Sequence, residues 1–113
     1  MENHDHISNQ FDNDLESIRN HVLSMGGLVE ANVKNAITSL LERDEALAEE
    51  VATADFKVNK MEVEIDEECT QIIAKRQPAA GDLRLVVTAI KVITDLERIG
   101  DEAEKIGRYA QTL

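Results

Sequence analysis

The feature that most constrains this chain is a three- and four-residue spacing of apolar positions that continues through most of its 113 residues. Apolar residues at that spacing form one stripe along an α-helix, whereas a half-buried strand alternates at every second residue. Only one proline, Pro78, and five glycines interrupt the pattern. Residues with strong strand preference never alternate with polar ones. The sequence therefore predicts an all-α protein.

Breaks in the apolar stripe divide the chain into three helices, which we expect at about residues 8–42, 45–75 and 79–112. Ser8 is the expected N-cap of the first helix and Asp44 that of the second. Pro78 stands where the third helix can begin, because its missing N–H is not needed there. Short connections make consecutive helices antiparallel. Residues 1–113 are thus predicted to form a single domain, an antiparallel three-helix bundle with long helices.

The third helix carries two apolar stripes about a third of a turn apart, so we expect it to face two neighbours. The main stripe contains Leu85, Ala89, Val92, Leu96, Ile99, Ala103, Ile106, Ala110 and Leu113. The second contains Leu83, Val86, Ile90 and Ile93. A basic ladder lies on the side away from the main stripe and consists of Arg84, Lys91, Arg98 and Lys105. We interpret this ladder, which is interleaved with acidic residues, as a solvated face with ion pairs between helical neighbours.

The composition excludes several classes of function. The chain has 12 Lys and Arg residues against 23 Asp and Glu, and the net charge of −11 would repel a phosphate backbone or an anionic lipid surface. Nucleic acid is therefore not an expected partner. No apolar run approaches the roughly 20 residues of a membrane span, and the polar N-terminus lacks the apolar segment of a secretion signal. We expect a cytoplasmic protein whose single cysteine, Cys69, is a reduced core residue.

Acidic residues replace apolar ones where the second stripe of the third helix continues. At about 100° per residue, Glu97 points in the direction of Ile90 and Ile93, and Asp101 follows one turn later. The second helix carries a comparable polar stripe made of Asp55, Asn59, Glu62 and Asp66. Folding the two helices back on each other places these acidic stripes at the same height, with Asp55 level with Glu102.

An all-oxygen cluster of this kind binds hard cations such as Mg²⁺, Ca²⁺ or Mn²⁺, and iron accepts it as well. The candidate metal ligands are Glu97, Asp101, Glu62, Asp66 and Asp55. The spacing does not distinguish Fe, Mn, Mg or Zn, or a single divalent metal from an iron cluster. In the alternative interpretation no metal binds, and the carboxylates pair with Arg98, Lys105 and Arg108 in a surface network.

Other features of the sequence bear on this site. Gly26 and Gly27 lie at a similar height in the first helix, and their cost of about 2 kcal/mol relative to alanine suggests a close approach of backbone or ligand, or a packing requirement. No Glu-x-x-His motif occurs, which argues against a ferritin-like di-iron oxidase. No phosphate-binding glycine loop or activated serine is recognisable. We therefore predict neither catalytic residues nor an organic cofactor.

The chain resembles the PhoU family of bacterial phosphate-signalling regulators over nearly its whole length. The resemblance is carried by MGGLVE at residues 25–30, VNKMEVEID at 58–66, IAKRQPAA at 73–80, DLRL at 82–85 and LERIGD at 96–101. It implies a fold of two tandem three-helix bundles, of which this chain has the first, either as a fragment of a two-bundle protein or as a single-bundle relative. It also implies (Glu/Asp)-x-x-x-Asp motifs that hold multinuclear metal clusters in some members. Here that motif falls on Glu97 and Asp101, and on Glu62 and Asp66, whereas Asn59 replaces an often acidic position.

The resemblance implies a non-enzymatic negative regulator that couples the phosphate ABC transporter to a sensor histidine kinase. The expected partners are the kinase and the transporter ATPase, so the protein would meet membranes only at the periphery of these complexes. The alternative function is metal storage or sensing by an acidic bundle, and a third interpretation is a helical assembly scaffold. Because the second bundle would cover part of the first or third helix, we also expect a symmetric homodimer.

Overall fold

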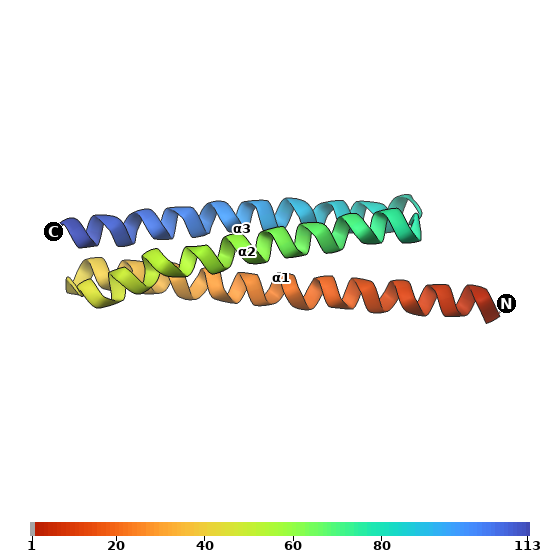
Figure 1. The fold of residues 1–113 in the computed structure, drawn as a ribbon, viewed down its shortest axis with the longest axis horizontal. Coiled ribbons are helices and arrows are strands. Elements are labelled where there is room, and N and C mark those ends of the chain that lie inside the picture. Colours follow the sequence, from red (N-terminus) through yellow and green to blue (C-terminus); the bar gives the residue numbers. More distant parts are fainter. Residues whose placement is uncertain (1) are drawn as a thin grey trace.

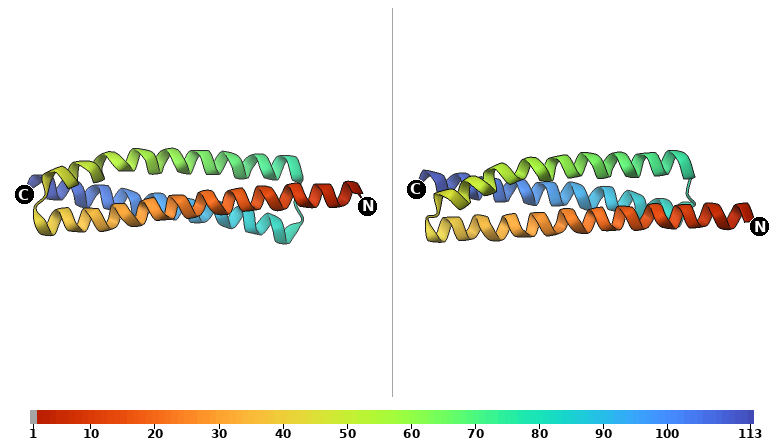
Figure 2. Two further views of the ribbon diagram at one scale, coloured as in Figure 1. Left: turned by 90° about the horizontal axis from the view of Figure 1, so that it is seen from below. Right: turned by 60° about the horizontal axis from the view of Figure 1, so that its bottom comes forward.

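The computed structural model describes the backbone of residues 2–113 and the side chains from residue 9 onward. Three helices, α1 (Glu2–Glu42), α2 (Glu45–Arg76) and α3 (Ala80–Thr112), run antiparallel and pack side by side as a rod (Figure 1). The rod measures 64 × 18 × 17 Å. Every pair of helices is in contact, as the turned views also show (Figure 2). The prediction of an all-α three-helix bundle is confirmed.

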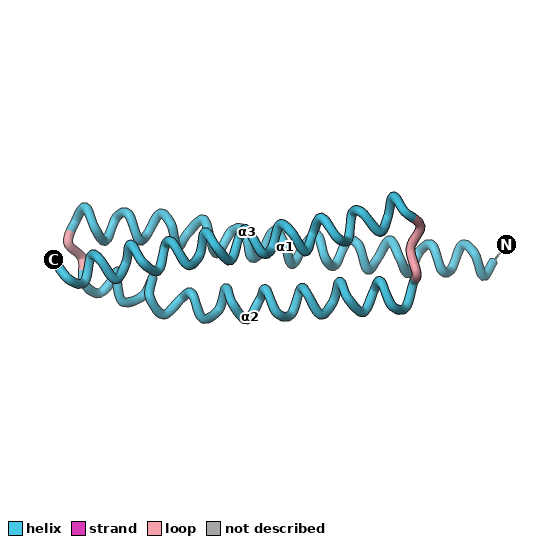
Figure 3. Tube along the Cα trace, turned by 90° about the horizontal axis from the view of Figure 1, so that it is seen from above, coloured by secondary structure: helices cyan, strands magenta, loops and turns pink. Residues whose placement is uncertain are grey.

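The helix ends agree with the prediction at α2 and α3 but not at the start of α1. Asp44 caps α2, because its Oδ1 accepts a hydrogen bond of 3.0 Å from the backbone N–H of Leu47. Two short links join the helices (Figure 3). The expected N-cap at Ser8 is wrong, since α1 already begins at Glu2 and Ser8 lies inside the helix. Residues 2–7 contain neither glycine nor proline, and acidic residues stabilise the first turns of a helix.

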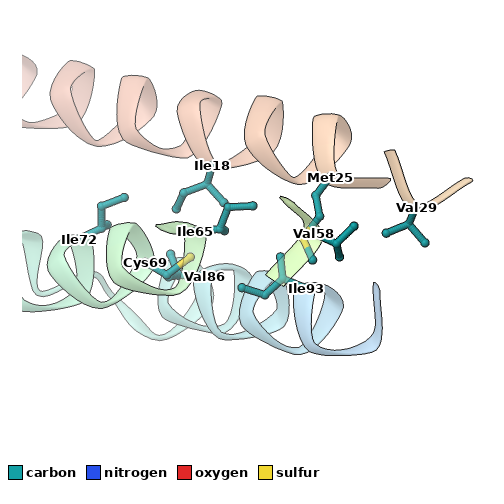
Figure 4. Close-up of a cluster of buried hydrophobic side chains, with 9 residues drawn as sticks. All are labelled: Ile18, Met25, Val29, Val58, Ile65, Cys69, Ile72, Val86 and Ile93. Atoms are coloured by element: carbon teal, nitrogen blue, oxygen red, sulfur yellow. The ribbon is translucent and has the colours of Figure 1, made fainter. Parts of the chain in front are cut away.

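The core consists of two apolar clusters that follow each other along the rod. The larger cluster contains Ile18, Met25, Val29, Val58, Ile65, Cys69, Ile72, Val86 and Ile93, which point inward from all three helices (Figure 4). The smaller cluster contains Ala36, Val51 and Ala103. Burial raises the pKa of the Cys69 thiol to about 11, which fits the core position expected for it. More apolar side chains are therefore buried beside the α2–α3 link than beside the α1–α2 link.

The predicted main stripe of α3 is only partly in the core. Its Leu85, Val92 and Ile99 are exposed, whereas its Ala103 and Ala110 are buried, as are Val86 and Ile93 of the second stripe. The buried line continues at the same seven-residue spacing through Gly100 and Gly107. These small residues allow α2 to approach α3 closely.

The basic ladder of α3 is exposed, as predicted. Arg84, Lys91, Arg98 and Lys105 all lie on the solvated side. Arg98 and Lys105 pair with acidic residues three positions earlier, Asp95 at 3.8 Å and Glu102 at 3.3 Å. Such exposed pairs contribute little to stability.

Polar side chains hold the seam between α1 and α2. Arg76 donates hydrogen bonds to Asp14 at 2.9 Å and to Gln10 at 3.1 Å. Further along the seam Glu68 accepts a hydrogen bond from Ser17 at 3.1 Å, and its other oxygen lies 3.2 Å from Nδ1 of His21. No helix over the described residues combines the length and the apolar character that crossing a membrane requires.

Candidate metal centre

Three carboxylates from two helices meet in the seam between α2 and α3. One oxygen each of Asp55 on α2 and of Asp101 and Glu104 on α3 lie within 4.8 Å of one another. Asp55 is only 4% exposed, and the other two are half-buried. This arrangement brings three acceptor groups together at the edge of the core.

The position of Asp55 depends on the glycine that faces it. A Cβ atom at Gly100 would lie 3.1 Å from Asp55 Oδ1 and 3.2 Å from Val58 Cγ1. Any side chain at Gly100 would therefore press on the carboxylate. Gly107, one heptad later, brings α3 close to the backbone oxygen of Ala48 in the same way. The close approach of α2 and α3 thus creates the site.

Asp55 and Asn32 form a polar layer between the two apolar clusters. On α2, Asp55 lies between Val58 of the larger cluster and Val51 of the smaller one. On α1, Asn32 lies between Val29 and Ala36, which belong to the same two clusters, so the two residues share one height. Both are buried, and Asn32 Nδ2 and Asp55 Oδ1 have no hydrogen-bond partner among the described residues.

The electrostatics of Asp55 follow from its burial among other acids. Burial, hydrogen bonding with Glu104 and Asp101, and repulsion from both raise the pKa of Asp55 to about 7. Interaction with Asp55 and the hydrogen bond from Arg108 lower the pKa of Glu104. Asn59 gives Asp55 weak support, since its Nδ2 is 3.5 Å from Oδ2. Asp55 is therefore best satisfied by a shared proton or by a cation.

A second acidic pair adjoins the first through Asp101. Burial, a hydrogen bond with Asp101 and repulsion from Asp101 and Glu62 raise the pKa of Glu97 to about 7. The pKa of Glu62 is also raised, first by burial and then by Asp66 and Asp101. Asp101 is thus the central residue of the acidic seam, which we define as Asp55, Glu62, Glu97, Asp101 and Glu104.

The structure brings four of the five predicted ligands together and leaves Asp66 outside the group. Asp55 and Asp101 belong to the group of three carboxylates, and Glu97 and Glu62 interact with Asp101. Asp66 is exposed and acts on Glu62 only by repulsion. Glu104 was missing from the predicted set. Its signal in the sequence is the spacing of three from Asp101 and seven from Glu97, which keeps all three on one helix face.

Only one of the three basic residues of the alternative interpretation pairs with the acidic seam. Arg108 binds Glu104, with Nη2 at 2.6 Å and Nε at 2.8 Å from Oε1. Arg98 and Lys105 pair with the exposed residues Asp95 and Glu102. Arg98 and Lys105 act on the acidic seam only through the electrostatic attraction of Arg98 to Glu97 and of Lys105 to Asp101.

The predicted close approach at Gly26 and Gly27 does not occur within the chain. A Cβ atom at either glycine would meet nothing within 4 Å among the described residues. Their use therefore has no explanation in the packing of this bundle. Glu30, which follows them, is exposed and takes no part in the acidic seam.

The residues of the acidic seam fit a hard cation. The donor set consists of oxygens alone, which suits Mg²⁺, Ca²⁺, Mn²⁺ or iron better than a soft metal. Asp55 Oδ1, buried and without a donor, is the kind of atom that a cation would satisfy. Bound there, a cation would be held by Asp55, Asp101 and Glu104, and it would offset the mutual repulsion of these groups.

The fold and the site together define a class, a long antiparallel three-helix bundle with carboxylates clustered between its second and third helices. The sequence model of the PhoU domain matches residues 22–110. The chain belongs to the PhoU family.

Similar proteins carry the name phosphate-specific transport system accessory protein PhoU, or a homologue of it. Over 105 residues and 93% of this chain, the identity is 60% to the protein of Serratia marcescens, 56% to that of Escherichia coli K12 and 56% to that of Pseudomonas putida. These matches cover 43%, 44% and 41% of the relatives. The chain thus spans less than half the length of the curated relatives it matches.

Solved structures of PhoU proteins have the same fold. The crystal structure of PhoU from Pseudomonas aeruginosa matches with a TM-score of 0.89 and 51% identity, over 91% of this chain and 49% of that one. The phosphate transport system regulatory protein PhoU from Streptococcus pneumoniae matches with a TM-score of 0.86 and 29% identity, over the same shares. The names of these relatives are those of accessory and regulatory proteins.

Proposed function

We propose that the chain acts in the regulation of phosphate uptake, as a non-enzymatic negative regulator on the cytoplasmic side of the membrane. The observation that carries this proposal is the 56 to 60% identity, over 93% of the chain, to accessory proteins of phosphate-specific transport systems. In this role the bundle couples the phosphate ABC transporter to a sensor histidine kinase and keeps phosphate-starvation genes off when phosphate is ample.

The regulatory role is tested in a bacterium that lacks its own PhoU protein and carries a phosphate-starvation reporter. We expect expression of the chain to lower the reporter in phosphate-rich medium. The coupling is tested by measuring binding of the purified chain to the transporter ATPase and to the cytoplasmic part of the kinase. Absence of binding to both partners, together with an unchanged reporter, would contradict the proposal.

We also propose that the acidic seam binds a hard divalent cation or iron. The buried Oδ1 of Asp55, which no donor meets among the described residues, favours this second function. Asp101 and Glu104 supply the other nearest oxygens, and Glu97 and Glu62 are placed to accept further ions. Metal binding in this seam serves storage or sensing, or adjusts the regulatory role.

The metal proposal is tested by elemental analysis and by titration of metal-free protein with Mn²⁺, Mg²⁺, Fe²⁺ and Zn²⁺. We expect Asp101→Asn to weaken binding by at least about tenfold, because it removes charge from the centre of the seam. The matched control is Asp95→Asn, which removes an exposed carboxylate from the same helix. Equal affinity of both variants, or no uptake of any metal, would contradict the proposal.

A further inference from the structure

The basic ladder of α3 contains two cations without an acidic partner among the described side chains. Arg84 and Lys91 are both exposed, and neither forms an ion pair with residues 9–113. The other two residues of the ladder each pair with an acidic residue three positions earlier. The whole chain has 23 acidic residues against 12 basic ones, so two adjacent free cations are unexpected on its surface. They are available to another molecule.

The local sequence explains why these two cations are free. Residues 69–94 contain a single acidic residue, Asp82. Asp82 precedes Arg84 by two positions, and residues two apart on a helix do not face each other. The next acidic residue, Asp95, is four positions after Lys91 but pairs with an arginine of the ladder at 3.8 Å. The half of α3 beside the α2–α3 link is therefore its basic half.

Both cations point away from the core, and an apolar side chain lies between them. Arg84 and Lys91 precede the buried residues Val86 and Ile93 by two positions, which places them about 160° around the helix from the core. They are seven residues apart, so they lie on one side of α3 at a distance of about 10.5 Å along its axis. Val87 stands between them and is 37% exposed. We define the basic face as Arg84, Val87 and Lys91.

We propose that the basic face binds an exposed helix of another protein that carries two carboxylates seven residues apart and an apolar residue between them. A helix lying alongside α3 has the same rise per residue, so carboxylates at this spacing meet both cations. The apolar residue packs against Val87. The proposal rests on the regulatory role proposed above, which requires a protein partner, and it gives the chemistry of one contact with that partner.

The distribution of charge favours a single helix over a broad anionic surface. The rod is only 17 to 18 Å thick and carries a net charge of −11, and Asp95 and Glu102 lie on the side of the basic ladder. Charges act over about 8 Å at physiological salt, so a membrane or a nucleic acid duplex laid on α3 would also meet these acids and be repelled. A helix about 10 Å wide meets the basic half alone.

The proposal is tested by calorimetric titration of the purified chain with the transporter ATPase and with the cytoplasmic part of the kinase. We expect Arg84→Glu combined with Lys91→Glu to weaken binding to one of these proteins by at least about tenfold, because both reversed charges repel the carboxylates. The affinity of the wild-type chain should fall as salt is raised from about 50 to about 300 mM, and that of the variant should change less.

The matched control is Lys34→Glu combined with Lys57→Glu, which changes the net charge equally at exposed positions of α1 and α2. We expect it to bind like the wild-type chain. Circular dichroism checks that both variants keep their helices, and Arg84→Gln combined with Lys91→Gln tests the same face without repulsion if the first variant loses helicity. Equal affinity of the basic-face variant and the control would overturn this inference alone. A wild-type chain that binds neither protein would overturn the regulatory role as well.

Two further measurements identify the chemistry of the partner. A carbodiimide joins an amine directly to a carboxylate in contact with it, so it should link Lys91 to an aspartate or glutamate in a helix of the bound protein. Links from Lys57 without any from Lys91 would contradict the proposal. Vesicles of phosphatidylcholine and phosphatidylglycerol should not bind the chain. Binding to them that Arg84→Glu combined with Lys91→Glu abolishes would assign the basic face to a membrane and overturn the proposal.

Discussion

Asp55 is the residue whose surroundings conflict most with its charge. It is held inside the bundle by the α2 stripe that buries Val51 and Val58, and its nearest polar neighbours on α3 are other acids. An ionised carboxylate in such a place is costly unless a proton or cation is shared. An apolar residue at this position would stabilise the core more than an aspartate does. The presence of an acid there is therefore a reason to expect a bound ion.

The raised pKa of Asp55 predicts how the stability of the metal-free protein depends on pH. Asp55 has a pKa of about 7 in the folded chain against an ordinary value of 3.8. Between these values the unfolded chain loses the proton while the folded chain keeps it, so the free energy of unfolding falls as pH rises and levels off above pH 7. The loss expected from Asp55 alone between pH 5 and pH 8 is on the order of 2 kcal/mol, and the raised pKa of Glu97 adds to it in the same direction.

Urea denaturation of the metal-free protein at pH 5 and pH 8 measures this loss. Asp55→Asn should remove the part of the pH dependence that Asp55 causes and be the more stable protein at pH 8. Glu97, whose pKa is also raised to about 7, titrates in the same window and leaves a residual slope in this variant, whereas the lowered pKa of Glu104 keeps its titration out of the window. A control with Asp95→Asn should keep the wild-type slope. If Asp55→Asn kept that slope as well, the buried carboxylate would not be the cause.

The glycines of α1 and α3 should respond in opposite directions to substitution by alanine. A Cβ atom at Gly107 would lie 3.2 Å from the backbone oxygen of Ala48 and 3.2 Å from Val51 Cγ1, so Gly107→Ala should destabilise the fold by about 1 to 2 kcal/mol. Gly27→Ala meets no atom and should stabilise it by up to about 1 kcal/mol through helix propensity. Thermal unfolding of both variants measures the difference, and equal signs would contradict the packing described for α2 and α3.

Individual residues of the site were only partly predictable from the sequence. Helix geometry placed Glu97 and Asp101 on one face and brought Asp55 to the same height, and the structure agrees. Helical spacing also makes Asp66 and Glu104 possible members of the site, but it does not show which of them lies between the two helices. That choice depends on Gly100, which draws α2 toward one side of α3. A glycine has no side chain and does not contribute to an apolar stripe. The apolar spacing therefore did not predict how Gly100 positions α2 against α3.

At the scale of the helices, the apolar period predicted the bounds of α2 and α3 well. It predicted less well which side of α3 faces the core. The bounds of α2 and α3 lie within one residue of those predicted, because Asp44 and Pro78 mark the links chemically. Leu85, Val92 and Ile99 of the main stripe of α3 are exposed, although Ala103 and Ala110 of the same stripe are buried. The apolar size of a side chain therefore did not show which part of the stripe faces the core.

The polar seam between α1 and α2 should contribute to stability through Arg76. This side chain is half-buried and donates to both Asp14 and Gln10 on α1. Arg76→Met should lower the free energy of unfolding by about 1 kcal/mol, and less at high salt. Arg98→Met, which breaks an exposed pair of 3.8 Å on α3, should change it by less than about 0.5 kcal/mol. Urea denaturation compares the two variants, and equal losses would show that burial of the pair is unimportant.

Across the whole molecule, the polar layer of Asn32 and Asp55 divides the rod into two parts of different stability. The larger apolar cluster occupies the part beside the α2–α3 link, and the smaller cluster of alanines and valine occupies the part beside the α1–α2 link. Less buried apolar surface means a smaller free energy of local opening. The acidic seam lies at the boundary, so an ion bound there joins α2 to α3 where the weaker part begins.

Hydrogen exchange should therefore detect the two parts and respond to metal. In metal-free protein we expect amides around Val51 and Ala103 to exchange faster than those around Ile65 and Ile93, because the smaller cluster opens first. Saturating Mn²⁺ should slow exchange mainly in the weaker part, since an ion held by Asp55, Asp101 and Glu104 would have to be released before that part opens. Mass spectrometry of peptides from both parts measures the difference. Asp101→Asn serves as the control and, because it should bind the ion more weakly, should need a higher Mn²⁺ concentration for the same response while leaving the order of exchange unchanged. Uniform exchange along the rod, or equal slowing of both parts by Mn²⁺, would contradict the division, because a cation that stabilised only the fully folded chain would protect both parts alike.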